Sequence, residues 1–227
     1  MKVVAFTGAG ISAESGLKTF RGDDGLWEGY NVEDVATPEA WQRNAELVQH
    51  FYNIRRKAVL EATPNAAHEA LAELETKFDV TIVTQNIDDL HERAGSTDII
   101  HLHGLITKAQ SSVDPSLIYD IQGDEIKMGD LCKKNSQLRP HVVWFGEPVP
   151  MMSVAIDVCR KADIFLIIGT SLQVYPAASL LNFVPYNARK ILIDPAAQEL
   201  NSAGTSITNI AEKASIGVPD IVNQLLK

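Results

Sequence analysis

The sequence predicts an α/β fold: a mainly parallel sheet with helices on both faces, together with a smaller inserted domain. Short apolar runs rich in β-branched residues alternate along the chain with amphipathic helical patterns, which is typical of parallel sheets buried on both faces. The first run, residues 2–6, leads directly into Thr7-Gly8-Ala9-Gly10. A buried strand followed by a glycine turn and a helix is how such folds hold the pyrophosphate of a dinucleotide.

This glycine turn is short, because the third glycine of the usual dinucleotide fingerprint is not at its expected place. Gly8 and Gly10 have no side chains, so we expect their backbone N–H groups to approach phosphate oxygens closely. Ser12 or Ser15 is expected to cap the helix that follows.

The remaining elements are predicted from periodicity and composition. Strands are expected over short β-branched runs: 80–84, 99–102, 164–168 and 190–193. Helices are expected where apolar residues recur at helical spacing: a short one from Pro38, then 45–62, 65–77, 154–161, 177–183 and 218–226. The stripe expected to face inward from the longest helix is Leu47, Phe51, Ile54 and Ala58. We expect residues 17–35 to form a loop that closes over a ligand, and 111–137 lack periodicity.

Composition excludes several classes of protein. The chain has 227 residues, and its formal net charge of −9 disfavours nonspecific binding to nucleic acid or to anionic membranes. No apolar run approaches the length of a membrane span. Cys132 and Cys159 provide no disulfide framework and indicate a reducing compartment. We therefore expect a cytoplasmic monomer without nucleic acid or membrane partners.

Four polar clusters each follow the C-terminal end of an apolar run. They are Gly8-Ala9-Gly10, Gln85-Asn86-Ile87-Asp88, His103-Gly104 and Gly169-Thr170-Ser171. In an open parallel sheet these strand ends lie at one edge, where ligands bind. Each cluster alone has an ordinary explanation as a turn, a helix cap or a structural histidine. Strand period places His101 and His103 on one face, so spacing does not choose between them.

The first motif extends well beyond its glycines. The run Gly8-Ala9-Gly10-Ile11-Ser12-Ala13-Glu14-Ser15-Gly16, followed by Thr19-Phe20-Arg21, resembles the N-terminal NAD motif of the sirtuins, the NAD-dependent protein-lysine deacylases. The resemblance covers nearly the whole chain. It implies a Rossmann-like NAD-binding domain made of residues 1–27, 78–104 and 139–227, and a small domain made of 28–77 and 105–138.

The resemblance also implies roles for individual positions. His103 matches the family's general base, Asn86 the residue that faces the ribose, and Asp88 the residue that binds the nicotinamide carboxamide. The NAD-binding residues implied are Gly8, Ala9, Gly10, Ser12, Phe20, Arg21, Gln85, Asn86, Asp88, His103, Gly169, Thr170, Ser171, Asp194 and Ala214. The family commonly has Asn where this chain has Asp194. The strand along which the substrate peptide would pair includes Val142, Phe145 and Gly146.

Tyr52 and Arg55 lie three residues apart on the helix expected at 45–62, so both project on one side. On the residues alone, Arg55-Arg56-Lys57 is an ordinary solvated face. Tyr-x-x-Arg also resembles the class III sirtuins, in which this pair binds the distal carboxylate of an acidic acyl group. The Ala13-Glu14-Ser15 variant of the first motif fits the same class.

One departure from the family concerns a metal. Sirtuins usually have two C-x-x-C pairs between the catalytic His and Arg139-Pro140-His141, and these four thiolates bind a structural zinc. Here Ser111 and Asp114 stand near the first pair, and Cys132 alone remains near the second. We therefore expect no zinc. The module would instead be held by small apolar contacts: Leu117, Ile118, Tyr119, Ile121 and Ile126.

The resemblance implies an enzyme that consumes NAD and an acyl-lysine segment of a protein, giving nicotinamide, O-acyl-ADP-ribose and free lysine. Acetyl, and also succinyl or malonyl, groups are the expected acyl groups. Two alternatives stay open: an NAD-consuming ADP-ribosyltransferase or glycohydrolase, and a catalytically silent NAD-binding sensor. The presence of His103 with Asn86 and Asp88 favours catalysis, because binding alone does not need a general base.

Overall fold

The computed structural model describes residues 1–18, 29–200 and 207–227. Within them the larger sheet has six parallel strands in the order β3-β2-β1-β7-β8-β9. The strands are β1 (Lys2–Thr7), β2 (Asp79–Thr84), β3 (Ile99–His101), β7 (Ile164–Ile168), β8 (Arg189–Ile193) and β9 (Ile207–Ile210). The predicted α/β class with a parallel sheet is confirmed. The edge strand β9 was not predicted.

The sheet is wound in two directions from its middle. The chain moves outward from β1 through β2 to β3, and then from β7 through β8 to β9 on the other side. In β1, Val3 pairs with Val80 on one side and with Ile164 on the other. The seam between β1 and β7 is therefore the point where the strand order reverses, and ligands bind beside such a point in open α/β sheets.

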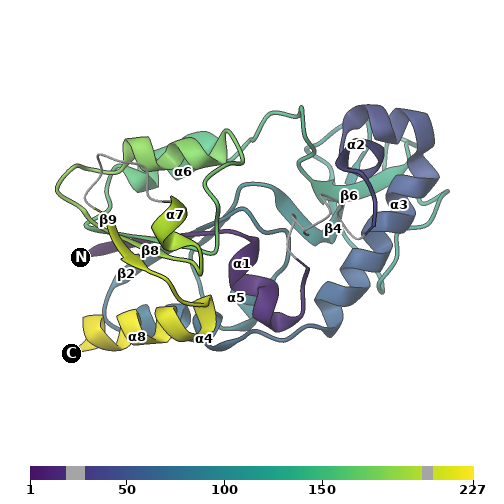
Figure 1. Ribbon diagram of the computed structural model, residues 1–227. Helices are drawn as coiled ribbons and strands as arrows, with labels where there is room; N and C mark the ends of the chain where they lie inside the picture. Colours follow the sequence, from purple (N-terminus) through teal and green to yellow (C-terminus); the bar gives the residue numbers. More distant parts are fainter. Residues whose placement is uncertain (19–28, 201–206) are drawn as a thin grey trace.

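Helices cover both faces of this sheet (Figure 1). Helices α4 (Ala66–Leu74) and α8 (Ala214–Leu226) pack on one face, and α6 (Met152–Cys159) and the 3₁₀ helix η2 (Ala177–Phe183) pack on the other. Short helical turns connect the strands: α1 (Ala9–Ser12), η1 (Ala13–Ser15), α2 (Val32–Val35), α5 (Leu90–Arg93) and α7 (Ala197–Leu200). Strand β1 is buried on both faces, so its run of apolar residues has no polar alternation.

A three-stranded antiparallel sheet lies away from the helices α6 and α8, beside α3 (Figure 1). Its strands are β4 (Gly104–Ser111), β5 (Ile118–Asp120) and β6 (Leu138–Val142), in the order β5-β4-β6. Helix α3 (Pro38–Glu61) begins with Thr37 as its cap and bends at Asn44, whose φ of −156° and ψ of 78° are not helical. This bend separates the short helix and the long helix that the sequence predicts. The proposed domain boundaries stay a prediction.

The buried face of α3 differs from the stripe that we expected. Phe51 is buried, but Ile54 is 47% exposed and Ala58 is also exposed. Arg56, expected on a solvated face, is 1% exposed, because its Nε donates to the carbonyl oxygen of Ile106 at 2.7 Å. Burial lowers the pKa of Arg56 to about 10, against the opposing charge of Asp124. The periodicity of apolar residues along a helix cannot reveal that a distant backbone carbonyl will accept a hydrogen bond from a buried guanidinium.

The segment between β4 and β6 is held mainly by polar contacts. Of the apolar residues expected to hold it, Ile126 is buried, whereas Ile118 is 49% exposed. The Sγ of Cys132 donates to Ser111 Oγ at 3.2 Å, and the Nζ of Lys134 lies 2.8 Å from Asp114 Oδ2. The expectation of a small apolar core was wrong here, because hydrogen bonds and an ion pair join the positions where the family has thiolates.

Candidate active site

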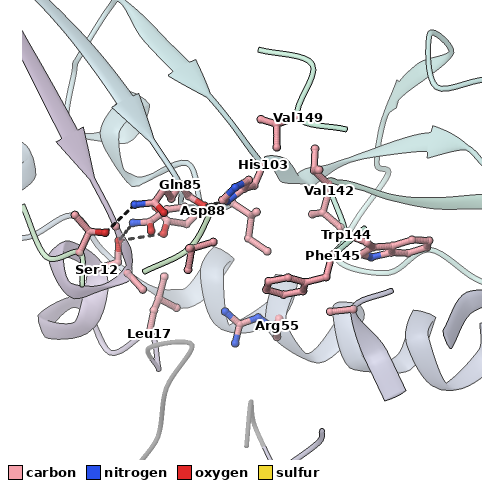
Figure 2. Close-up of a pocket in the computed structure, with 18 of the residues that line it drawn as sticks. Ser12, Leu17, Arg55, Gln85, Asp88, His103, Val142, Trp144, Phe145 and Val149 are labelled. Atoms are coloured by element: carbon pink, nitrogen blue, oxygen red, sulfur yellow. Dashed lines mark hydrogen bonds between the residues drawn. The ribbon is translucent and has the colours of Figure 1, made fainter. Parts of the chain in front are cut away.

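A cavity of about 360 Å³ runs along the carboxyl edge of the large sheet and continues to α3 and the loop after β6. All four polar clusters predicted at strand ends contribute to it. The predicted site residues that line it are Gly8, Ala9, Gly10, Ser12, Tyr52, Arg55, Gln85, Asn86, Asp88, His103, Val142, Phe145, Gly146, Gly169, Thr170, Ser171 and Asp194. Figure 2 shows this arrangement, with Ser12, Gln85 and Asp88 on the left, His103 beside them, Trp144 and Phe145 on the right, and Arg55 below.

Three predicted residues are not placed in the cavity. Phe20 and Arg21 lie outside the described residues. Ala214 is buried at the first position of α8 and is not part of the lining. The lining also includes residues inside the predicted site segments that were not named as site residues, Leu17, Lys18, Ile87, Val143, Trp144 and Glu147, and residues outside those segments: Ala36, Val59, Val149, Val174, Tyr175 and Pro176. Most of these are apolar, and nothing in a sequence separates an apolar cavity wall from an ordinary core.

The glycines after β1 bring two loops together at the seam of the sheet. The N–H of Gly8 donates to Ile168 O at 3.0 Å, and the N–H of Gly10 donates to Gly169 O at 2.9 Å. A Cβ added to Gly10 would lie 2.6 Å from Gly169 Cα. The expectation that both amides face phosphate is therefore wrong. The missing side chains let the β1 and β7 loops touch, which shapes the floor on which a pyrophosphate would lie.

Ser12, Asn86 and Asp88 form a buried hydrogen-bonded cluster. The Nδ2 of Asn86 donates to Ser12 Oγ at 3.1 Å, and Ser12 Oγ donates to Asp88 Oδ2 at 3.0 Å. Ser12 makes no helix cap with its side chain, contrary to the expectation. Burial raises the pKa of Asp88, while hydrogen bonds from Leu90 N and Ser12 lower it in part. The cluster presents an amide and a carboxyl group, which suit a carboxamide and a sugar hydroxyl.

Gln85 links the two halves of the sheet edge. Its Nε2 donates to Thr170 Oγ1 at 2.9 Å, so the loop after β2 is tied to the loop after β7 across β1. At the far end of this edge, Asp194 Oδ1 accepts from Ala196 N at 2.9 Å. The edge therefore offers a polar surface that extends from the loop after β2 to the loop after β8, on the side of the sheet where dinucleotides bind in such folds.

His103 is arranged as a general base. Its Nδ1 lies 2.8 Å from Gln85 O, and since a carbonyl only accepts, Nδ1 carries the proton. Nε2 is then the unprotonated atom, on a ring that lines the cavity. Burial lowers the pKa of His103 more than the Gln85 bond raises it, so the imidazole is neutral near pH 7. A neutral imidazole with one fixed proton can accept a proton from a hydroxyl group.

The other end of the cavity combines apolar walls with Tyr52 and Arg55 (Figure 2). Tyr52 is 2% exposed, and burial raises its pKa, so its hydroxyl keeps its proton. The part of the wall formed by the loop after β6 is held by Arg139. Its guanidinium carbon lies 3.8 Å from the centre of the Trp144 ring, and its Nη2 donates to Glu147 Oε1 at 2.8 Å. This end of the cavity therefore brings apolar walls and a guanidinium together.

Comparisons with known proteins show which family the chain belongs to. A family model described as the Sir2 family matches residues 8–176. A protein of Bacteroides thetaiotaomicron named NAD-dependent protein deacylase is 52% identical over 229 residues, which cover 99% of this chain and 97% of that protein. A Helicobacter pylori protein of the same name is 49% identical over 225 residues, covering 99% and 97%. A solved Sir2 homolog–NAD complex has a TM-score of 0.87 and 38% identity, covering 99% of this chain and 89% of that chain.

Proposed function

The chain belongs to the Sir2 family, the sirtuins, and is an NAD-dependent protein-lysine deacylase; we propose that it acts on lysines whose acyl group ends in a carboxylate, as succinyl and malonyl groups do. NAD is its co-substrate, and protein segments with acyl-lysine are its substrates. Acetyl-lysine would be accepted as well, because the cavity walls near His103 are apolar.

We assign the chemistry to the edge of the large sheet. NAD would lie along the loops after β1, β2 and β7, with its nicotinamide end at the Asn86 and Asp88 cluster. The acyl oxygen of the lysine would attack the nicotinamide ribose, and nicotinamide would leave. His103 Nε2 would then remove a proton from a ribose hydroxyl, whose oxygen attacks the acyl carbon; with addition of water, lysine is released and the acyl group stays on ADP-ribose. The carboxamide of nicotinamide can pair with Asp88, whose neighbours Ser12 and Leu90 already supply its other hydrogen bonds.

The observation that carries the acyl proposal is the placement of Tyr52 and Arg55 in the same cavity as His103. Both come from α3, and a guanidinium offers a planar fork that matches a carboxylate. Glu147 also lines the cavity, but its Oε1 accepts from Arg139 and its Oε2 accepts from Trp144 N at 2.8 Å. Its charge is therefore balanced within the wall, and Arg55 places a guanidinium in the same cavity as His103.

The test is kcat/KM for acetyl-, malonyl- and succinyl-lysine peptides, with wild type and Arg55→Met. We expect wild type to process succinyl-lysine at least as well as acetyl-lysine. Loss of one partner of a desolvated charge pair costs on the order of 2–5 kcal/mol, so Arg55→Met should lower succinyl kcat/KM by roughly 30-fold or more. Deacetylation should survive or improve, because a methyl group gains nothing from a cation beside it.

Lys57→Met is the matched control, since Lys57 is an exposed cation on the same helix and does not line the cavity. It should change neither activity by more than about 2-fold. Equal losses on acetyl and succinyl peptides in Arg55→Met would mean that Arg55 is structural and that the acyl proposal is wrong.

We further propose a cytoplasmic monomer. Its two cysteines, Cys132 and Cys159, are both unpaired, which suits a reducing compartment. Within the described ranges, no helix has the length and apolar character needed to cross a bilayer.

A further inference from the structure

We propose that His101, the residue that pairs with Glu92, is a positioning residue: its bond to Asn86 O holds the main chain there so that the Asn86 amide meets the ribose of NAD. The proposal rests on the site assigned above to Asn86. It does not depend on which acyl group the enzyme prefers.

The two histidines of His101-Leu102-His103 bind consecutive carbonyl groups of one loop. His101 Nδ1 lies 3.4 Å from Asn86 O, and His103 Nδ1 lies 2.8 Å from Gln85 O. His101 is the last residue of β3, which pairs in parallel with β2 through Thr84 and His101, and His103 lies in the turn just after it. Both imidazoles therefore contact the loop that carries the Asn86 and Asp88 cluster.

The second nitrogen of each ring separates their roles. His101 Nε2 lies 2.7 Å from Glu92 Oε1, with the two side chains 11% and 38% exposed. Burial alone would raise the pKa of Glu92, but the hydrogen bond and charge of His101 lower it overall, so the group is a carboxylate. A carbonyl and a carboxylate both only accept, and His101 must therefore donate through both nitrogens. It has no lone pair left to act as a base, unlike His103.

Asn86 is held on three sides by this arrangement. Its N–H donates to Thr84 Oγ1 at 3.0 Å, its carbonyl accepts from His101, and its Nδ2 donates to Ser12 Oγ at 3.1 Å. Its Oδ1 makes no hydrogen bond within the part of the chain that the structure describes. Rotation of the Asn86 peptide would turn this oxygen away, and His101 is the contact that opposes such a rotation at the carbonyl.

His101 also acts on the neighbouring carboxyl group of Asp88. Burial raises the pKa of Asp88, and the charge of His101 is among the influences that oppose this. The same histidine thus contacts the loop at Asn86 O and is among the groups that favour the ionised form of Asp88.

Two variants of His101 separate its two bonds. The amide nitrogen of Asn occupies the place of Nδ1, so His101→Asn keeps a donor for Asn86 O, whereas His101→Gln keeps a donor for Glu92. We measure kcat and KM for NAD with an acetyl-lysine peptide, exchange of labelled nicotinamide into NAD, and Tm. His101→Gln should lower kcat and the exchange rate about 10-fold or more, and His101→Asn should stay within about 3-fold of wild type.

The matched control is Glu75→Gln. Glu75 also anchors the chain before β3, accepting from Thr97 N at 3.0 and 3.2 Å, but it does not contact Asn86. It should leave kcat and exchange unchanged. Equal losses in both His101 variants, or losses that follow Tm alone, would overturn the positioning role.

Asn86→Ala is the reference variant. If it keeps full activity and exchange, the assignment of the site to Asn86 is overturned, and the role of His101 with it. If Asn86→Ala loses activity strongly while both His101 variants are unaffected, only the role of His101 is overturned.

Discussion

The two walls of the cavity are held in place by different means. At the edge of the large sheet, functional side chains bond to one another: Ser12 to Asp88, and Gln85 to Thr170. A change in one of these residues removes a partner from the next. This wall is therefore expected to act as a unit, so that its residues contribute non-additively to the reaction.

The opposite wall includes helix α3, which is held by hydrogen bonds on the side that faces away from the cavity. Arg56 donates to Ile106 O, and Arg93 donates to Val59 O at 3.0 Å and to Ala62 O, near the C-terminal end of α3. Arg55, next to Arg56, faces the cavity instead. A cavity-facing side chain can therefore be replaced without removing what holds the helix. The difference implies that chemistry and acyl choice can be separated by mutation.

The largest effect is expected for His103→Ala, at the first wall. Loss of the general base should lower deacylation of every acyl-lysine peptide by about 10²–10⁴-fold. NAD affinity should stay within a few-fold, since the hydrogen bonds of the other edge residues remain. Steady-state rates with acetyl and succinyl peptides, together with NAD binding, check this. Retention of most of the activity would show that His103 is not the base.

The same assignment fixes the sign of the pH dependence. The base must be neutral, and burial lowers the pKa of His103 below its ordinary value of 6.5. Activity should therefore persist as the pH falls through 6.5 and be lost only below it, because protonation removes the lone pair. The measurement is log(kcat/KM) from about pH 5 to 9. An acid limb above 6.5 would contradict the assignment.

Arg56→Gln tests what holds the second wall. A buried hydrogen bond from a charged group contributes about 1.5–3 kcal/mol, so Tm should fall by roughly 5–10 °C. At temperatures well below Tm, acetyl and succinyl activities should decline together. Arg55→Met should show the reverse, with a selective kinetic loss and little change in Tm. Thermal melts and both kcat/KM values compare the neighbours. A loss of succinyl activity without a loss of acetyl activity in Arg56→Gln would contradict the proposed difference between the two walls.

A smaller effect is expected for Tyr52→Phe. It removes one neutral hydrogen-bonding hydroxyl, worth about 0.5–1.5 kcal/mol, or roughly 2- to 10-fold in kcat/KM for succinyl-lysine. Deacetylation should change by less than about 2-fold. Parallel assays with both peptides decide it, and a larger loss on acetyl than on succinyl would place Tyr52 outside the carboxylate site.

No effect is expected from removing metal ions. Among residues 1–18, 29–200 and 207–227, no three His, Cys, Asp or Glu side chains gather as ligands would. Metal analysis of purified protein should find no stoichiometric zinc, and a strong chelator should not lower Tm. One tightly held zinc per chain would overturn this prediction.

The parallel sheet and its ligand edge could be predicted because each buried strand has a β-branched run followed by a polar cluster. The bend of α3 was also visible, as a break between two helical patterns. Strand β9 was missed because it is a four-residue edge strand, and β4 because its sequence, Gly104–Ser111, mixes polar and apolar residues without clear period.

The candidate site was predictable to the extent that its residues are polar and lie at strand ends. Spacing alone does not choose between His101 and His103, and the choice of His103 came from the family resemblance; that His101 contacts Glu92 is not visible in the sequence. Arg56 was misjudged because burial of a charge depends on carbonyl groups from distant segments, such as Ile106 O. The roles of the individual site residues stay predictions until the variants above are measured.

The contact of the two glycine loops at the sheet seam limits how the enzyme could be re-engineered. A Cβ on Gly169, whose φ is +58°, would lie 2.4 Å from Ile11 N, and one on Gly8 would lie 2.8 Å from Gly169 O. A saturation library at Gly8, Gly10 and Gly169 should therefore return only glycine among folded clones. Attempts to make the enzyme accept an altered dinucleotide have to vary positions such as Ser171 or Asp194, which line the same cavity and are not among the atoms that a Cβ on these glycines would meet.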